Sequence, residues 1–300
     1  MNTMALPPVV AGDPGTITPD DDGGAEERVL AEIAALGLER NAWELDTKGF
    51  TILAPSQAAP PEFFKQLRDR ILCEASLATG VEVGLIGEAA SQFEVSALGR
   101  CQYLPEIFFA DPMFEQALMN RHVLALVSYL LGESCILTGM NAVIKGPGPE
   151  SFPLHTDTPQ PAPLPAFAQV ANATWLLSEY TIENGPTVLV PGSHKACRSP
   201  TRAESVDFSR AVPVVAPAGS IVIWHGNCWH GAAARTAPGV RISLITYFAR
   251  YYMRPPSAGA YGERVTDEML DRNPPRFARL MHHKPLSVAG EWVCRISHFA

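Results

Sequence analysis

The second half of the chain is a succession of short β-prone runs separated by turn residues. Proline and glycine punctuate it, and the 300 residues include 27 prolines and 23 glycines. The runs expected as strands are residues 169–180, 188–190, 212–215, 220–224 and 240–251. Short strands that recur with turns between them are typical of a sandwich or barrel of antiparallel strands. The chain is therefore predicted to be mainly β.

Apolar stripes at helical spacing occur before and after this β-rich part. The expected helices cover residues 25–36, a stretch that begins at 60, residues 112–119 and 123–131, and, interrupted at Pro274-Pro275, residues 266–281. Further strands are expected at 49–53, 100–103 and 135–145. These patterns predict flanking helices, with the leading ones packed on one sheet. Residues 1–24, rich in Pro, Gly and Asp, are expected to form a disordered N-terminal arm, and residues 25–300 a single domain.

Composition narrows the choice of partners. The formal net charge is -8 and no run of basic residues occurs, which argues against binding to nucleic acid or to an anionic membrane surface. No signal peptide and no apolar stretch long enough to span a bilayer is visible, so a cytoplasmic location is expected. The six cysteines form no C-x-x-C pair and are interpreted as free or buried thiols.

A His-x-Asp pair, His155 and Asp157, is the first candidate for chemistry. On a strand, side chains two residues apart lie on the same face, so this imidazole and this carboxylate can bind one divalent metal. His230 is the best candidate for a third ligand, and His225 is its rival. Cys228 is a conceivable fourth ligand but is expected to pack as a small apolar residue. Two histidines and one carboxylate would make the facial triad of non-haem Fe(II) oxygenases.

Arg241 is the second candidate. It follows His230 after residues 231–239, which have the composition of a loop, so the two segments are predicted to be neighbouring strands. Arg241 and Ser243 would share a face, where a guanidinium and a hydroxyl suit a carboxylate. A dicarboxylic 2-oxo acid could then chelate the metal at one end and reach Arg241 at the other. On another expected strand, Gln102 could face a pocket.

Several motifs, in this order and spacing, resemble the phytanoyl-CoA dioxygenase family of Fe(II)/2-oxoglutarate oxygenases. They are His155-Thr-Asp157, Glu183-Asn-Gly-Pro-Thr-Val-Leu-Val-Pro-Gly-Ser-His194, His230-Gly231, Arg241 and the exit Tyr251-Tyr-Met-Arg-Pro255. The resemblance covers roughly residues 45–285 and is most specific in the second half of the chain.

The resemblance implies a double-stranded β-helix, also called a jelly roll or cupin-like fold. It implies that Fe(II) is held by His155, Asp157 and His230, and that 2-oxoglutarate lies against Arg241, which stands at the family spacing from His230 and not from His225. The residues that match family positions lining the co-substrate pocket are Trp175, Thr187, Asn141, Gln102 and Ser243. His194 is interpreted as a structural loop residue.

Two features refine the resemblance. Many members carry a serine after the His-Gly pair, where this chain has Ala232, and its loss removes one carboxylate contact. Related halogenases have Gly or Ala at the position of Asp157. The retained carboxylate therefore argues against halogenation.

The implied activity is oxidation, most simply hydroxylation, of an unactivated C–H bond in a small lipophilic molecule, with 2-oxoglutarate converted to succinate and CO₂. Desaturation, cyclisation or rearrangement of a secondary metabolite is the alternative by the same chemistry. A non-oxygenase metal enzyme or a binding protein on the same barrel also stays open. The expected partners are this substrate and O₂, and the sequence is compatible with a homo-oligomer. Substrate selection is expected in loops 78–100 and 159–168 and after Tyr252.

Overall fold

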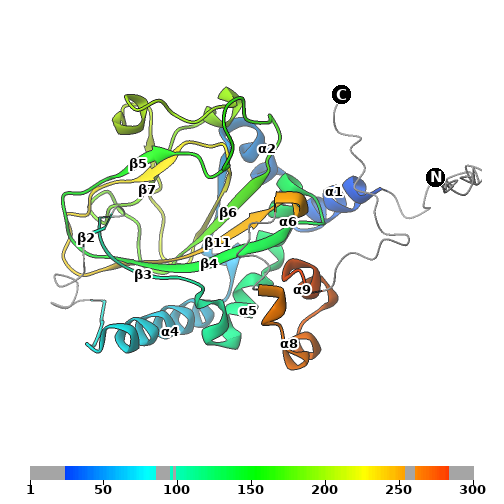
Figure 1. Cartoon of the computed structure of the whole chain (residues 1–300), viewed down its shortest axis with the longest axis horizontal. Helices are drawn as coiled ribbons and strands as arrows, with labels where there is room; N and C mark the ends of the chain where they lie inside the picture. The colour runs from blue at the N-terminus through cyan, green and yellow to red at the C-terminus, as the bar shows by residue number, and fades with distance from the viewer. Residues whose placement is uncertain (1–23, 86–94, 97–98, 254–260, 284–300) are drawn as a thin grey trace, which may run out of the picture.

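The computed structural model describes residues 24–85, 95–96, 99–253 and 261–283, and these form two antiparallel sheets with helices on one side (Figure 1). The larger sheet has the order β1 (Phe50–Leu53), β9 (Ile221–His225), β6 (Val170–Leu176), β11 (Arg241–Ala249), β4 (Ile136–Lys145), β3 (Gly99–Leu104) and β2 (Val95–Ser96). The smaller sheet has the order β5 (Phe152–His155), β10 (His230–Ala232), β7 (Thr187–Leu189) and β8 (Val212–Pro213). The prediction of a mainly β jelly roll with flanking helices is confirmed.

Helices cover the outer face of the larger sheet (Figure 1). They are α1 (Ala25–Ala35), α2 (Glu39–Lys48), α3 (Pro55–Ala58), α4 (Pro61–Thr79), α5 (Pro112–Leu118), α6 (Arg121–Leu131), α8 (Asp267–Arg272) and α9 (Pro275–Leu280). One apolar cluster joins them to the sheet and extends from Ile33 to Met281. No helix among the described residues is long and apolar enough to cross a bilayer.

Side chains alternate between the two faces of the larger sheet along each strand. On β11, Ile242, Leu244 and Phe248 join the helix-side cluster, so Arg241 and the residues that alternate with them face the smaller sheet. A second cluster fills the space between the sheets and contains Leu176 and Trp224 from one sheet and Leu189 from the other. The face toward this second cluster is called the interior face below.

Two expectations about the elements need correction. The segments that hold His230 and Arg241 are not paired strands, because β10 and β11 belong to different sheets and residues 233–240 cross between them. Helix α2 was not predicted. Its ten residues are largely polar, and its stability depends on burial of Ala42 and Leu45 and on Gly49, which ends it in the left-handed conformation.

The predicted N-terminal arm, except Gly24, lies outside the described residues, as do parts of the loop at 78–100 and of the region after Tyr252.

Candidate metal centre

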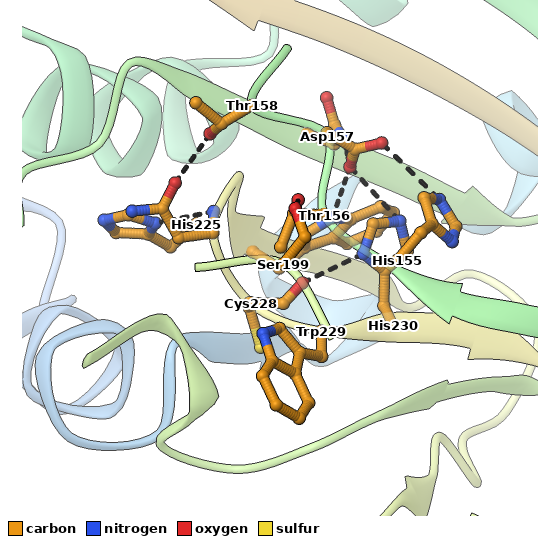
Figure 2. A network of polar contacts seen from close by, with 12 residues as sticks. His155, Thr156, Asp157, Thr158, Ser199, His225, Cys228, Trp229 and His230 are labelled. Carbon is orange, nitrogen blue, oxygen red and sulfur yellow. Dashed lines mark hydrogen bonds and ion pairs between the residues drawn. The ribbon is translucent and has the colours of Figure 1, made fainter. Parts of the chain in front are cut away.

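Three potential ligands meet at one end of the smaller sheet. His155 on β5 and His230 on β10 are directly opposite each other, and Asp157 follows β5 by two residues. Nε2 of His230 lies 3.1 Å from Oδ2 of Asp157, and Nε2 of His155 lies 3.7 Å from Oδ1. One ligand atom from each residue lies within 4.8 Å of the other two. Figure 2 shows both imidazoles turned toward the carboxylate.

The residue between the first two ligands points away from them, as strand alternation requires. Thr156 forms a hydrogen bond of 2.6 Å with the hydroxyl of Ser199 (Figure 2). Gly231 allows β5 to approach β10, because a Cβ atom at this glycine would lie 2.4 Å from the carbonyl oxygen of Phe152. The structure therefore gives a local reason for the His-Gly pair: a side chain there would push the two histidine strands apart.

Hydrogen bonds fix how the imidazoles are presented. Nδ1 of His155 lies 3.0 Å from the carbonyl oxygen of Pro153, and Nδ1 of His230 lies 3.0 Å from that of Cys228. A carbonyl can only accept, so each Nδ1 carries the proton and each Nε2 keeps a lone pair directed at the site. Burial lowers the pKa of His230, although the charge of Asp157 opposes the shift. A neutral imidazole is the form that binds a metal.

The carboxylate of Asp157 is held by two side chains from the larger sheet. Nε1 of Trp224 donates to Oδ2 over 3.1 Å, and the side-chain amide of Asn172 donates to the same oxygen. The backbone N–H of Asp157 donates to the carbonyl of Gly226 over 2.9 Å. Sequence reasoning missed Trp224 and Asn172. Asn172 could have been found as an amide side chain within the largely apolar sequence of β6, because a buried amide needs a hydrogen-bond partner.

The rival ligands lie elsewhere. Nδ1 of His225 accepts from the backbone N–H of Asn227 over 3.0 Å, and burial lowers its pKa to about 3. Nε2 of His194 lies 3.1 Å from the carbonyl oxygen of Asp46 on α2, which fits the structural role inferred from the sequence. Cys228 is buried in the cluster between the sheets, and burial raises its thiol pKa to about 12. The described residues thus gather His230, not His225, with the His-x-Asp pair.

Arg241 lies on the interior face and is only 5% exposed. Its Nη1 donates to the carbonyl of Gly185 over 2.6 Å, and its guanidinium lies 4.8 Å from the ring centre of Tyr180. Its Nε is buried and has no hydrogen-bond partner among the residues that the structure describes. A buried guanidinium with an unused donor is suited to a carboxylate supplied from outside the chain.

Two more buried cations accompany Arg241. Lys145 is its partner across β4 and β11, and its Nζ donates to the carbonyl of Ala233 over 2.7 Å. Burial, followed by the charge of Arg241, lowers the pKa of Lys145 to about 8. Arg235 donates to carbonyls of its own loop, including that of Gly239 over 3.2 Å. None of these cations is within ion-pair distance of a carboxylate in the described part of the chain, so the cluster favours an anion.

Three of the remaining predicted co-substrate residues lie on the interior side. Ser243 donates to the carbonyl of Val143 over 3.4 Å, and Asn141 on β4 lies opposite Ile245, two residues from Ser243 along the same face. Thr187 lies opposite Ala232 on β10, two residues from His230 along the same face. These positions are compatible with contact to a ligand between the metal and Arg241.

Trp175 and Gln102 are not brought to this site. The indole of Trp175 packs against Phe63 and Phe64 of α4, with ring centres 5.8 and 5.4 Å apart. The amide of Gln102 donates to the carbonyl of Ala75 on α4 over 3.0 Å. Both side chains lie on the helix-covered face, away from Arg241 and the metal ligands, so the structure does not support the prediction that they line the co-substrate pocket. Successive side chains along a strand point to opposite faces of the sheet. Each of these two side chains therefore points away from the interior face, toward which its neighbours in the strand point.

Comparison with known proteins gives consistent matches. The model of the family described as Phytanoyl-CoA dioxygenase (PhyH) matches residues 90–243. A dioxygenase named af480 from Aspergillus fumigatus is 35% identical over 161 residues, which are 52% of this chain and 50% of that protein. The uncharacterized protein Rv1501 from Mycobacterium tuberculosis is 27% identical over 178 residues, 57% of this chain and 63% of its own. The match thus spans between half and two thirds of these relatives.

Solved structures share the fold. The non-heme alpha ketoglutarate dependent epimerase SnoN from nogalamycin biosynthesis is 20% identical, with a TM-score of 0.55 over 72% of this chain and 83% of that one. HygX from Streptomyces hygroscopicus, solved with nickel and 2-oxoglutarate bound, is 16% identical, with a TM-score of 0.56 over 72% of this chain and 88% of its own. The predicted double-stranded β-helix is confirmed.

Proposed function

This chain belongs to the phytanoyl-CoA dioxygenase family, and from that premise we propose that it is an Fe(II)- and 2-oxoglutarate-dependent dioxygenase. Its reaction would oxidise, most simply hydroxylate, an unactivated C–H bond of a small lipophilic molecule. The relative named as a dioxygenase and the 2-oxoglutarate bound to HygX support this activity. The geometry that supports it is the cluster of His155, Asp157 and His230, whose ligand atoms lie within 4.8 Å of one another. These three residues are called the metal cluster below.

The donor set fits the iron that the proposal requires. The set consists of two imidazole Nε2 atoms and one carboxylate. It matches the two-histidine, one-carboxylate set of non-haem Fe(II) oxygenases, which leaves coordination positions open. The bound iron and 2-oxoglutarate would supply the oxidising power, through reaction with O₂ and release of succinate and CO₂. Asn172 and Trp224 would hold the Asp157 carboxylate in place through their hydrogen bonds.

The cationic cluster fits the co-substrate. Arg241, with its buried and unpartnered Nε, would bind the distal carboxylate of 2-oxoglutarate, with Lys145 adding a second positive charge beside it. Thr187, Ser243 and Asn141 would line the space toward the metal. We also propose one domain over residues 25–300, acting in the cytoplasm on a small molecule and O₂. The apolar cluster that extends from Ile33 to Met281, across the helices and the larger sheet, supports the domain assignment.

Succinate formation tests this function. Metal-free protein given Fe(II), 2-oxoglutarate and O₂ is expected to release succinate, and Asp157→Ala and His230→Ala are expected to abolish the release. His225→Gln is the matched control, because that imidazole lies outside the metal cluster. Succinate release that is unchanged in His230→Ala would refute the ligand assignment. Iron binding without any succinate would favour the non-oxygenase metal enzyme or binding protein.

A further inference from the structure

A pocket of about 300 Å³ lies beside the metal cluster, at the lower end of the range for small-molecule sites. Its walls include Asp157, Asn141, Tyr247, Val170, Pro159 and Met253. Among its described lining residues no Lys, Arg or His occurs, and Asp157 is the single carboxylate. A larger groove of about 770 Å³ against α3 and α4 contains none of the metal ligands. Apart from the metal ligand Asp157, the smaller pocket is therefore lined by uncharged residues, several of them apolar.

Tyr247 is positioned in this pocket by its neighbours on both sides. Across β6 it lies opposite Asn172, whose amide donates to the Asp157 carboxylate. Across β4 it lies opposite Gly139. A Cβ atom at Gly139 would lie 3.3 Å from Cδ2 of Tyr247, tighter than ordinary van der Waals contact. The missing side chain of Gly139 therefore leaves room for the phenol ring to lie against β4, at the level of the residues that hold the metal ligand.

The hydrogen bonds of Asn141 decide what the phenol can offer. Oδ1 of Asn141 accepts from the backbone N–H of Glu106 over 3.0 Å, so its side-chain N–H groups remain for the Tyr247 hydroxyl oxygen. Burial, followed by the charge of Asp157, raises the pKa of Tyr247, so the hydroxyl keeps its proton. The Tyr247 hydroxyl therefore has a proton to donate into the pocket that it lines. No acceptor for it is found among the described residues.

We propose that Tyr247 anchors the substrate by donating a hydrogen bond to an uncharged oxygen acceptor, a carbonyl, ether or hydroxyl, and thereby sets which C–H bond faces the metal. This inference rests on the proposed function and deepens it. It makes the substrate an uncharged, largely apolar molecule with at least one oxygen. No described pocket residue offers a cation for an anionic group, and the positive charge of the bound iron would already be met by Asp157 and 2-oxoglutarate. Tyr247 is thus a positioning residue, because it acts on the substrate and not on the metal.

The test uses three probes of similar shape with the anaerobic protein loaded with Fe(II) and 2-oxoglutarate. The probes are 4-fluoroacetophenone, its deoxy analogue 4-fluoroethylbenzene and the anion 4-fluorobenzoate, with binding followed by fluorine NMR. The ketone is expected to bind roughly fivefold more tightly than the deoxy analogue, the ratio that one neutral hydrogen bond provides. Benzoate is expected to bind more weakly than the ketone. In Tyr247→Phe the ratio of ketone to deoxy analogue is expected to fall close to one.

Tyr129→Phe is the matched control, because that phenol lies on α6 and donates to Asp46, away from the pocket. Gly139→Ala is a second variant, expected to weaken binding of the ketone by displacing the Tyr247 ring. A ratio near one in the wild-type protein, tighter binding of benzoate, or an unchanged ratio in Tyr247→Phe would overturn the proposal. The visible band of the Fe(II)–2-oxoglutarate complex should persist in Tyr247→Phe. Its absence from the wild-type protein would instead count against the proposed function.

Discussion

The two faces of the seven-stranded sheet use the same strands for different purposes. The helix-covered face presents Trp175, Leu244 and Ile144, all fully buried and packed in one apolar cluster. The interior face presents amides, a phenol and buried cations, including Asn172 and Arg241. Polar groups on the interior face lie toward the metal cluster, and Nε of Arg241 has no hydrogen-bond partner in the described part of the chain. The comparison indicates that the outer face serves stability and the interior face serves ligand binding.

The largest expected effect on stability is that of Trp175→Ala, which changes the helix-covered face. The indole is fully buried against Phe63 and Phe64, and its removal is expected to cost about 3–5 kcal/mol of unfolding free energy. Denaturant unfolding measures the loss. Trp175→Phe keeps an aromatic ring in the packing and removes an indole N–H that has no hydrogen-bond partner among the described residues. It should therefore retain most of the stability and full affinity for 2-oxoglutarate. Weakened co-substrate binding in Trp175→Phe would break the division.

Arg241→Met is the corresponding change on the interior face. Loss of a charge-assisted hydrogen bond is expected to weaken 2-oxoglutarate binding by about 1.5–3 kcal/mol, roughly 10- to 150-fold. Stability should be unchanged or increased, because the variant removes a buried cation that has no ion-pair partner among the described residues. Calorimetric titration and thermal unfolding on the same samples separate the two effects. Lower stability with normal affinity would contradict the account.

The buried imidazole of His225 sharpens the comparison through the pH dependence of stability. His225 lies on the helix-covered side, opposite Ala171, and burial, with help from His194 and Arg250, lowers its pKa to about 3. Between about pH 6 and 4 the unfolded chain binds a proton at His225 that the folded protein does not. Stability should therefore fall with acidification, by at most about 1.4 kcal/mol per pH unit from this residue.

The control for this pH effect is a matched pair of variants. His225→Gln should reduce the slope of unfolding free energy against pH over this range. His122→Gln, which removes a more exposed imidazole at the start of α6, should leave most of it. Equal slopes in the wild-type protein and in His225→Gln would show that His225 is not the group that titrates.

The smallest expected effect is that of Gln102→Met. Its amide donates to the carbonyl of Ala75 on α4, while its Oε1 is buried without a hydrogen-bond partner in the described ranges. Loss of one neutral hydrogen bond is nearly offset by loss of that unsatisfied oxygen, so stability should change by less than about 1 kcal/mol. Affinity for 2-oxoglutarate should not change. A tenfold weaker affinity would return Gln102 to the co-substrate pocket.

Local patterns in the sequence predicted most of the strands, most helices and the residues that meet at the metal cluster. The His155 and Asp157 pair was predictable because alternation along a strand is a local property. The side to which Trp175 points was not, because β6 is buried on both faces and its apolar run has no alternation. The roles of Lys145 and Trp224 depend on which strands pair, and this is a property of the whole fold.

The central claim is that one metal cluster and one buried guanidinium on the interior face together bind iron and 2-oxoglutarate. The most direct measurement is an anaerobic titration of metal-free protein with Fe(II) and then 2-oxoglutarate, followed by the visible metal-to-ligand charge-transfer band. The account predicts a band that disappears in His230→Ala, weakens strongly in Arg241→Met and persists in Trp175→Phe. Iron binding without a band, or a band indifferent to Arg241→Met, would contradict it.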